Sequence, residues 1–316
     1  MELIRGLNGL NDRHRGSVVT IGTFDGMHLG HQALLARLKE HGRRLSRPVM
    51  VLTFEPMPRE YLLGAGQAPA RLTSCRERWR VLERLGCDFL WLLRFGPPLR
   101  GLSGEAFAEL LARELRTPLI VVGHDFRFGR NGEATAAMLS GAGRRLGFEV
   151  DVLPAVTVDG ERVSSSGVRD ALAKGDFAQV RRWLGRPYTM TGRVVQGNRL
   201  GRSLGFPTAN LQIERRRSPV QGIFAVRVHG IVDTALPGVA SLGTRPTVDG
   251  EHTLLEAHVF DFSGDLYGRE IEVEFVAKLR EEEHFPSLDA LVAQMHEDAA
   301  QARDLLRNGF GTADLE

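Results

Sequence analysis

Two histidines three residues apart stand in a glycine-rich segment near the N-terminus. The segment reads Gly22-Thr23-Phe24-Asp25-Gly26-Met27-His28-Leu29-Gly30-His31. Glycines let the backbone approach a phosphate, a helix N-terminus offers unpaired N–H groups, and a spacing of three places both histidines on one helical face. The combination predicts a site for a nucleotide polyphosphate.

Two other interpretations of this segment are weaker. Histidines at this spacing can bind zinc, but no nearby third ligand such as a cysteine is evident. The segment could also be a glycine-rich turn with two incidental surface histidines. A G-x-x-x-x-G-K-[ST] motif is absent from the sequence, which excludes a P-loop enzyme.

Glycines also punctuate a stretch in the second half of the chain. Gly192, Gly197, Gly201 and Gly205 lead into Phe206-Pro207-Thr208-Ala209-Asn210. Such glycines let a backbone wrap a nucleotide, and threonine and asparagine offer neutral oxygens to a magnesium ion that already carries phosphates. A flexible loop of a β-barrel is an equally open alternative on these residues alone.

The elements that must position the histidines form an alternating pattern between Val18 and about Leu153. Short apolar runs alternate with helical patterns, which predicts a parallel sheet wound by helices. The histidine segment then lies at the carboxyl end of the first strand, where ligands bind in such sheets. The runs are Val18–Ile21, Val49–Phe54, Phe89–Leu93, Leu119–Val122 and Val150–Leu153. Two short helices, about 166–174 and 176–184, are expected to close this half.

After Pro187 the pattern changes to short β-like runs separated by Gly, Pro, Asn and Asp. The runs are Tyr188–Val195, Gly222–Val228, Val239–Leu242, Leu254–Phe260 and Ile271–Ala277. They predict a small antiparallel barrel, covered by a helix that Ser287 caps and that carries an apolar stripe. The expected fold class is α/β, with a doubly wound parallel sheet over 1–185 and a small antiparallel β-barrel with a terminal helix over 186–316.

Composition excludes several classes of protein. The 316 residues suffice for two domains, and 42% hydrophobic with 25% charged residues is typical of a folded soluble chain. A net charge of +2 favours neither a nucleic-acid nor a membrane partner, and Arg215-Arg216-Arg217 is expected to be a solvated loop. Two cysteines, Cys75 and Cys87, without a signal peptide or a membrane-length apolar run, predict a cytoplasmic protein.

The first half resembles the bacterial bifunctional riboflavin kinase/FAD synthetase family. Gly22–His31 has the G-x-F-D-G-x-H-x-G-H form of that family's nucleotidyltransferase signature, and Thr53–Pro58, Gly123–Gly129 and Val163–Arg169 match it in order. The resemblance implies that residues 1–185 are a nucleotidyltransferase domain, which makes FAD and pyrophosphate from FMN and ATP.

The same resemblance implies roles for individual residues of this half. His28 and His31 would contact the ATP phosphates as catalytic residues. Further contacts to ATP or its phosphates would come from Gly22, Phe24, Asp25, Gly30, Ser164, Ser165 and Arg169. The flavin side would be lined by Phe54, Pro56, Pro58, Asp125 and Phe128, although each aromatic or proline alone is more typical of a core or a turn. The segment Gly129–Gly132 is shorter and less basic than is usual in the family.

The second half resembles the riboflavin kinase part of that family. Gly205–Leu211 reads G-F-P-T-A-N-L, close to a diagnostic motif, and Pro219–Val226, Gly243–Thr247 and Glu256–Phe262 follow in order. The resemblance implies that residues 186–316 make FMN and ADP from riboflavin and ATP. Ser241 stands where the family commonly has Asn, which would weaken a substrate contact there.

Glu256 matches the carboxylate proposed as catalytic in the family that this half resembles, and it is therefore the candidate base. Riboflavin's ribityl hydroxyl is neutral, so a carboxylate that takes its proton would help phosphoryl transfer. The resemblance further implies that Thr208 and Asn210 hold Mg²⁺ brought with ATP, and that Gly197 and Gly201 lie at its phosphates. Strand alternation predicts that Glu256 shares a face with Leu254 and His258. An ordinary solvent-facing glutamate is the alternative.

The expected partners are therefore small molecules: riboflavin, FMN, FAD and ATP. Two alternatives remain open on the sequence. Only one half of the chain could be active, which the short Gly129–Gly132 segment favours. The chain could also be a non-catalytic sensor of flavins or nucleotides, which the retained histidine pair and Glu256 disfavour.

Overall fold

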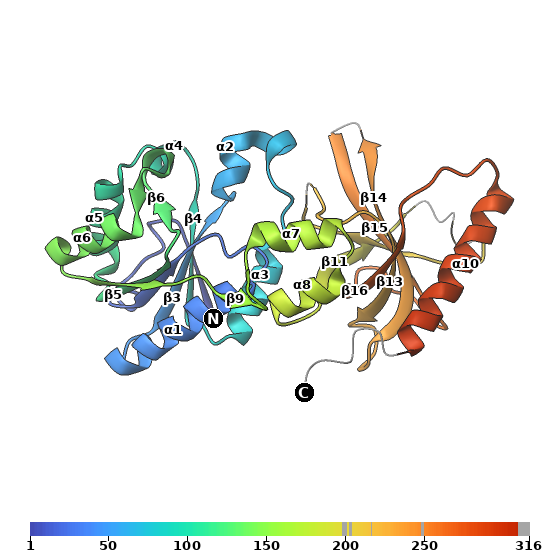
Figure 1. Ribbon diagram of the computed structural model, residues 1–316, viewed down its shortest axis with the longest axis horizontal. Helices are drawn as coiled ribbons and strands as arrows, with labels where there is room; N and C mark the ends of the chain where they lie inside the picture. The colour runs from blue at the N-terminus through green and yellow to red at the C-terminus, as the bar shows by residue number, and fades with distance from the viewer. Residues whose placement is uncertain (198–200, 202–203, 216, 248–249, 309–316) are drawn as a thin grey trace. The chain divides into compact units, whose positions relative to one another are not determined.

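The computed structural model describes residues 1–197, 201, 204–215, 217–247 and 250–308, which form two compact units (Figure 1). The first unit consists of Met1–Pro69 and Arg78–Ser164, and the second of Ala70–Glu77 and Ser165–Glu316. A parallel sheet occupies the first unit and a closed antiparallel barrel with a terminal helix the second, so the predicted fold class is confirmed.

A six-stranded sheet of order β1-β4-β3-β2-β5-β8 forms the centre of the first unit, and all neighbouring strands are parallel. The strands are β1 (Glu2–Arg5), β2 (Val18–Ile21), β3 (Val49–Glu55), β4 (Phe89–Arg94), β5 (Leu119–Gly123) and β8 (Glu149–Leu153). The five predicted strands are confirmed, and β1 adds an edge strand. The strand order reverses between β2 and β5, so their carboxyl ends border the crevice typical of a ligand site.

Helices cover both faces of this sheet. Alternate strand residues contribute to two separate apolar clusters, one with Leu111 of α5 and Leu139 of α6, the other with Leu35 and Leu38 of α1. The helices are α1 (Leu29–Leu45), α2 (Pro58–Gln67), α3 (Cys75–Arg84), α4 (Pro97–Arg100), α5 (Gly104–Leu115) and α6 (Ala136–Leu146). The smaller elements are β6 (Arg127–Phe128), η1 (Arg130–Gly132), β7 (Ala134–Thr135), β9 (Thr157–Val158) and β10 (Glu161–Arg162).

The barrel of the second unit has six antiparallel strands in the order β11-β12-β15-β14-β13-β16. They are β11 (Tyr188–Val195), β12 (Ala209–Gln212), β13 (Gly222–His229), β14 (Leu236–Thr247), β15 (Gly250–Val259) and β16 (Glu270–Arg280). Periodicity did not predict β12, because its four residues lie inside the glycine-rich stretch. Pairing of β16 with β11 closes the barrel and leaves no strand edge open there.

Helices α7 (Ser165–Ala173), α8 (Phe177–Leu184) and α10 (Leu288–Arg307) pack in the barrel unit. The first two form where they were predicted, but they belong to this unit because Phe177 of α8 packs on Phe224 and Phe275 of the barrel. Helix α10 covers the barrel as predicted, with Ala302 in an apolar cluster beside Ala225. Within the described ranges, no helix is both long enough and apolar enough to span a membrane.

The prediction of a solvated arginine loop is wrong for Arg215. Its guanidinium is buried and pairs with the buried carboxylate of Glu77, with 2.5 Å between Nη2 and Oε2. Glu77 also accepts a hydrogen bond from the backbone N–H of Thr191 at 2.7 Å, so segment 70–77 is fastened to β11. A run of charged residues can thus contain a buried residue whose ion-pair partner is distant in the sequence. Arg217 is exposed, and Arg216 lies outside the described residues.

Candidate active sites

The loop after β2 carries the predicted phosphate site of the first unit. Phe24, Gly26 and Met27 have φ angles of 52°, 86° and 50°, in the left-handed region that favours glycine. For the two non-glycine residues this conformation costs on the order of 1–3 kcal/mol each, and such residues concentrate at functional sites. Both side chains are fully buried in the core beside Leu35 of α1, and this packing holds the loop in place.

His28 and His31 come together at the start of α1. His28 is the N-cap residue, and its ring stacks on that of His31 with centroids 3.7 Å apart and planes inclined by 20°. Burial, with help from His28 and Arg78, holds the pKa of His31 well below its usual range. The ring is therefore neutral at physiological pH, and a neutral imidazole offers one N–H donor to a phosphate oxygen. Both histidines thus face the same small region beside a helix N-terminus.

Arg78 of α3 supports this loop, although the sequence pattern did not single it out. Its side chain is fully buried; Nη1 donates to the carbonyl oxygen of Thr23 at 2.5 Å, and Nη2 pairs with Oε2 of Glu55 at 3.3 Å. The guanidinium therefore joins the end of β3 to the histidine loop and adds positive charge next to it. No sequence signal marks this residue, because α3 contains several arginines.

The other predicted ATP residues of the first unit lie in or beside the same loop. A Cβ on Gly22 would come 3.2 Å from the ring of Phe24, and a Cβ on Gly30 would come 3.1 Å from the ring of His28. Asp25 is buried at 2% exposure. Phe24 is also buried, so in this conformation it supports the loop from the core, and its predicted contact with ATP stays a prediction.

The serine–arginine group of the predicted phosphate site is divided between the units. Ser164 ends the chain segment of the first unit, whereas Ser165 and Arg169 lie on α7 of the second. The side chain of Arg169 donates from Nε to the carbonyl oxygen of Ala70 at 2.5 Å within the second unit. The shared phosphate role of these three residues stays a prediction.

Three predicted flavin residues follow one another at the carboxyl end of β3. Phe54 is half-buried, and its ring meets that of Phe95 edge-on with centroids 6.0 Å apart. Pro56 follows β3, and Pro58 begins α2. These residues are partly accessible on the ligand-binding edge of the sheet, and a flavin contact is compatible with their position.

The remaining two predicted flavin residues follow β5. Phe128 is 8% exposed and packs on Phe126 and Phe107, with ring centroids 5.3 Å and 5.8 Å apart. This is the core packing expected of a lone aromatic, so a flavin contact by Phe128 stays a prediction. Asp125 is exposed, and its carboxylate forms an ion pair with Arg162.

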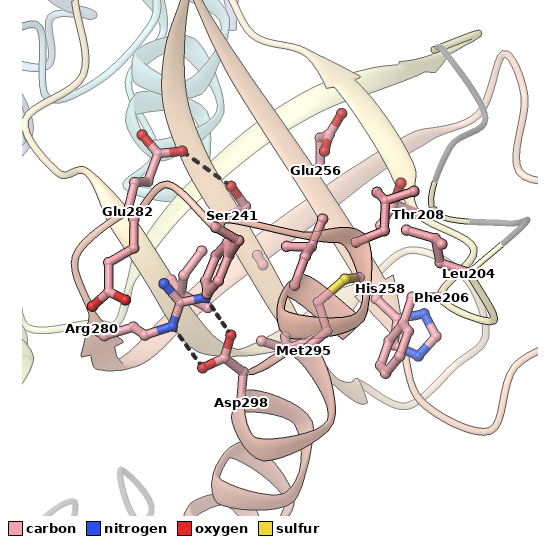
Figure 2. Close-up of a pocket in the computed structure, with 18 of the residues that line it drawn as sticks. Leu204, Phe206, Thr208, Ser241, Glu256, His258, Arg280, Glu282, Met295 and Asp298 are labelled. Atoms are coloured by element: carbon pink, nitrogen blue, oxygen red, sulfur yellow. Dashed lines mark hydrogen bonds and ion pairs between the residues drawn. The ribbon is translucent and has the colours of Figure 1, made fainter. Parts of the chain in front are cut away.

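A pocket lies on the outer face of the barrel beside α10 (Figure 2). One wall is a row of residues in direct register across five strands, namely Asn210, Glu256, Ser241, Ile223 and Arg280. The facing wall comes from α10 and the segment before it, with Phe285, Leu288, Leu291 and Met295. The barrel therefore brings the predicted base and a predicted magnesium ligand side by side in one pocket.

Glu256 lies on the outward face of β15. Its neighbours Leu255 and Ala257 are fully buried, whereas Leu254, Glu256 and His258 are partly exposed, as strand alternation predicted. The glutamate is therefore not an ordinary solvent-facing strand residue, because it lines a pocket with apolar residues opposite. A carboxylate placed there can accept the proton of a bound hydroxyl group.

Close packing explains two of the predicted glycines. A Cβ on Gly197 would lie 2.4 Å from Oδ1 of Asn210, and a Cβ on Gly201 would lie 2.3 Å from the carbonyl oxygen of Phe206. The contact at Gly201 is with a backbone atom and leaves no room for a larger residue, whereas a larger residue at 197 would displace the side chain of Asn210. Thr208 and Asn210 line the pocket, and their side chains carry the hard oxygen donors that magnesium prefers. The donor set therefore fits the predicted ion.

Two charged contacts of the pocket were missed at the sequence level. Arg280 forms a bidentate ion pair with Asp298 of α10, with Nε–Oδ1 at 2.9 Å and Nη2–Oδ2 at 2.8 Å. The hydroxyl of Ser241 donates to Oε1 of Glu282 at 3.5 Å (Figure 2). A Cβ on Gly243 would lie 2.3 Å from the same oxygen, so this glycine makes room for Glu282. Arg280, Glu282 and Asp298 carry no signal in the sequence, because charged residues near element ends are usually solvated.

Two family models match the chain in succession. Residues 10–167 match the model of FAD synthetase, and residues 184–306 match that of riboflavin kinase. Over 306 residues the chain is 45% identical to the bifunctional riboflavin kinase/FMN adenylyltransferase of Escherichia coli (strain K12), covering 96% of this chain and 97% of that relative. The chain belongs to the bifunctional riboflavin kinase/FMN adenylyltransferase family. The resemblance of its two halves to that family is thereby confirmed.

Further relatives of the same family cover equally much of the chain. The Pseudomonas fluorescens protein is 46% identical over 307 residues, covering 96% of this chain and 98% of the relative. The Haemophilus influenzae protein is 41% identical over 304 residues, with the same shares covered. A crystal structure described as a macrolide-efflux protein from Streptococcus pneumoniae has a TM-score of 0.81 at 31% identity and covers 97% of this chain and 98% of that one. Family membership identifies the chain as an enzyme rather than a non-catalytic sensor.

Proposed function

We propose that residues 186–316 phosphorylate riboflavin with Glu256 as the general base. The observation that carries the proposal is the register of Asn210, Glu256 and Ser241 in one pocket wall. Glu256 takes the proton of the terminal ribityl hydroxyl as that oxygen bonds to the γ-phosphorus of ATP and the bond to the β-phosphate oxygen breaks. The products are FMN and ADP.

The two walls of the pocket are proposed to bind different substrates, one wall MgATP and the other the flavin ring of riboflavin. Thr208 and Asn210 stand at the end where Mg²⁺ and the ATP phosphates are proposed to bind, and the ion neutralises charge on the phosphate oxygens when bound. The wall of Phe285, Leu288, Leu291 and Met295 is apolar and suits the flat flavin ring. The ribityl chain of the bound riboflavin then extends from this wall toward Glu256.

We infer that residues 1–185 transfer the adenylyl group of ATP to FMN. An oxygen of the FMN phosphate attacks the α-phosphorus, and pyrophosphate leaves with the electrons of the broken bond. The FMN phosphate is already an anion, so this step needs positioning and stabilisation of negative charge more than a base. The His28–His31 pair beside the N-terminus of α1 and the buried Arg78 guanidinium support that assignment.

Magnesium is proposed as the metal of both reactions, brought in with ATP. The described residues contain no cluster of three or more His, Cys, Asp or Glu side chains suited to hold a metal ion. The hydroxyl and amide oxygens of Thr208 and Asn210 can complete the coordination of an ion that already carries phosphates and water. A stoichiometric zinc ion that survives chelation and is needed for turnover would contradict this proposal.

Incubating the full-length protein with riboflavin, ATP and magnesium tests the proposed function. Chromatographic separation of the flavins over time should show FMN first and FAD later, and a chelator should stop both products. FMN without FAD would mean that only the second half is active. Riboflavin that binds but stays unchanged would contradict the proposal.

A cytoplasmic location is also proposed. Cys75 and Cys87 are both free, and burial raises the pKa of the Cys87 thiol to about 12. Two unpaired thiols suit a reducing compartment. Fractionation of cells that express the chain at its native level should find it with cytosolic markers, and recovery in an extracytoplasmic fraction would contradict the proposal.

A further inference from the structure

The motif that holds Thr208 leaves the barrel's hydrogen-bond ladder at its first residues. Strand β12 begins at Ala209, which pairs with Ala257 of β15. Pro207, two residues earlier, has no backbone N–H and cannot donate to a ladder. Thr208 therefore stands at the point where β12 pairing begins, and its position depends on how the preceding residues are held.

A side chain of β15 holds this segment. Nδ1 of His258 lies 2.8 Å from the carbonyl oxygen of Pro207. A carbonyl oxygen only accepts hydrogen bonds, so Nδ1 carries the proton and donates it. The ring is fixed on two sides, because its centroid lies 5.2 Å from that of Phe206 and 5.7 Å from that of Phe260. A side chain thus continues the contact between β12 and β15 beyond the backbone pairing.

His258 also stands in the pocket that contains Glu256. It follows Glu256 by two residues on the same face of β15, which is about 7 Å along the strand. Both residues line the pocket with Thr208 (Figure 2). Asn210 lines the same pocket. We propose that His258 is a positioning residue for riboflavin phosphorylation. Its Nδ1–H bond to the carbonyl oxygen of Pro207 fixes the next residue, Thr208, in the pocket that Glu256 also lines. This inference rests on the kinase chemistry proposed for the second unit.

The physical consequence is a defined place for the ATP phosphates. Residue His258 itself touches neither the metal nor the transferred phosphoryl group in this account. Its bond sets the Thr208 hydroxyl relative to the base, and an error of about 1 Å in such positioning costs on the order of a hundredfold in rate. Loss of this bond should therefore lower kcat and kcat/KM for MgATP. The KM for riboflavin should change little, because the apolar wall proposed to bind the flavin ring stays intact.

Four variants of the full-length protein separate this role from packing. His258→Leu removes the donor and keeps bulk. His258→Asn places an amide N–H near the position of Nδ1, whereas His258→Gln carries its amide further from the backbone. His296→Leu is the matched control, because its ring also packs on Phe206, with centroids 4.8 Å apart, but it lies on the exposed face of α10.

Steady-state rates of FMN formation give the decisive comparison. We expect His258→Leu to lower kcat/KM for MgATP by about tenfold to a hundredfold with the KM for riboflavin within about twofold, and His258→Asn to recover most of the loss while His258→Gln does not. Conversion of supplied FMN to FAD should be unchanged in every variant, which shows that each chain is folded and active in its first half.

Three outcomes would overturn the inference. His258→Leu could match His296→Leu in kcat/KM for MgATP, His258→Asn could be no better than His258→Gln, or the loss could appear in the KM for riboflavin alone. If the His258 variants lose FAD formation as well, the residue is needed for folding and the positioning role fails. If the wild-type chain forms no FMN, the proposed kinase function fails instead, so the two failures are distinguishable.

Discussion

Asn210 and Glu256 are direct partners across the antiparallel strands β12 and β15 of the barrel. Directly opposed residues on one face have Cβ atoms about 4.5–5.5 Å apart. The proposed magnesium ligand Asn210 and the proposed base Glu256 therefore approach the same small volume. The two residues lie 46 positions apart in the sequence, and the pairing of β12 with β15 in the barrel brings them together. The proposed kinase site depends on this pairing.

Gly201→Ala is expected to impair FMN formation. The new Cβ would lie 2.3 Å from the carbonyl oxygen of Phe206, a backbone atom that no rotamer change can move away. The displaced motif would lower kcat/KM for MgATP by about tenfold or more, measured with riboflavin as the acceptor. Gly66→Ala adds a methyl group in open space and should have no effect. Equal rates in the two variants would contradict the close-packing role of Gly201.

Arg78→Met should destabilise the first unit and slow FAD formation. The change leaves the carbonyl of Thr23 and the partly exposed carboxylate of Glu55 without their buried partner, which costs about 1–3 kcal/mol. Urea unfolding and the rate of FAD formation from FMN measure the two effects. Arg84→Met, at an exposed position of the same helix, is the control and should resemble wild type. If the Arg78→Met variant is as stable and as active as wild type, Arg78 has no role in supporting the site.

Stability should depend on pH through His31. Its pKa is lowered in the folded protein by burial, by His28 and by Arg78, but it is about 6.5 in the unfolded chain. Between these values the unfolded chain binds more protons, so the free energy of unfolding falls as the pH drops below about 6.5. His31→Gln should flatten this dependence in urea unfolding at a series of pH values. His124→Gln, an exposed histidine of the same unit, should keep the wild-type profile; an unaltered profile in His31→Gln contradicts the assignment.

Periodicity predicted most of the fold because the longer elements have strong apolar patterns. Spacing alone predicts the helix that begins at Leu288 and five strands of the parallel sheet, namely β2, β3, β4, β5 and β8. Strand β2 has only four residues but reads as an apolar run, whereas β1 (Glu2–Arg5) and β12 (Ala209–Gln212), also of four residues, mix polar and apolar residues and show no such run. The burial of Arg215 was not predicted for another reason, since its buried ion-pair partner Glu77 lies 138 positions away in the sequence.

The candidate site was predictable where residue types carry the chemistry themselves. The histidine pair, Thr208, Asn210 and Glu256 stood out by type, spacing and family resemblance, and the structure places each in a loop or pocket. Arg78, Glu282 and His258 were not assigned roles, because their importance comes from hydrogen bonds to groups far away in the sequence. Local patterns contain no information about such partners.

The histidine pair should be needed for FAD formation alone. His28→Ala combined with His31→Ala removes both stacked rings from the loop after β2. The pyrophosphate that leaves ATP would then lack donors that stabilise its charge. We expect FAD formation from supplied FMN to be lost, with FMN formation from riboflavin nearly unchanged. Rates with each acceptor in the same preparation give the answer. Loss of both activities in a folded protein would contradict separate sites.

Glu256→Gln, assayed with riboflavin and with FMN as separate acceptors, tests the central claim most directly. The amide keeps the shape of the side chain but cannot accept the ribityl proton, so FMN formation should slow by roughly a hundredfold or more. FAD formation from supplied FMN should continue at the wild-type rate, because the FMN phosphate needs no deprotonation by Glu256. Equal loss of both activities, or full retention of riboflavin phosphorylation, would contradict the assignment of Glu256 as the base of a separate kinase site.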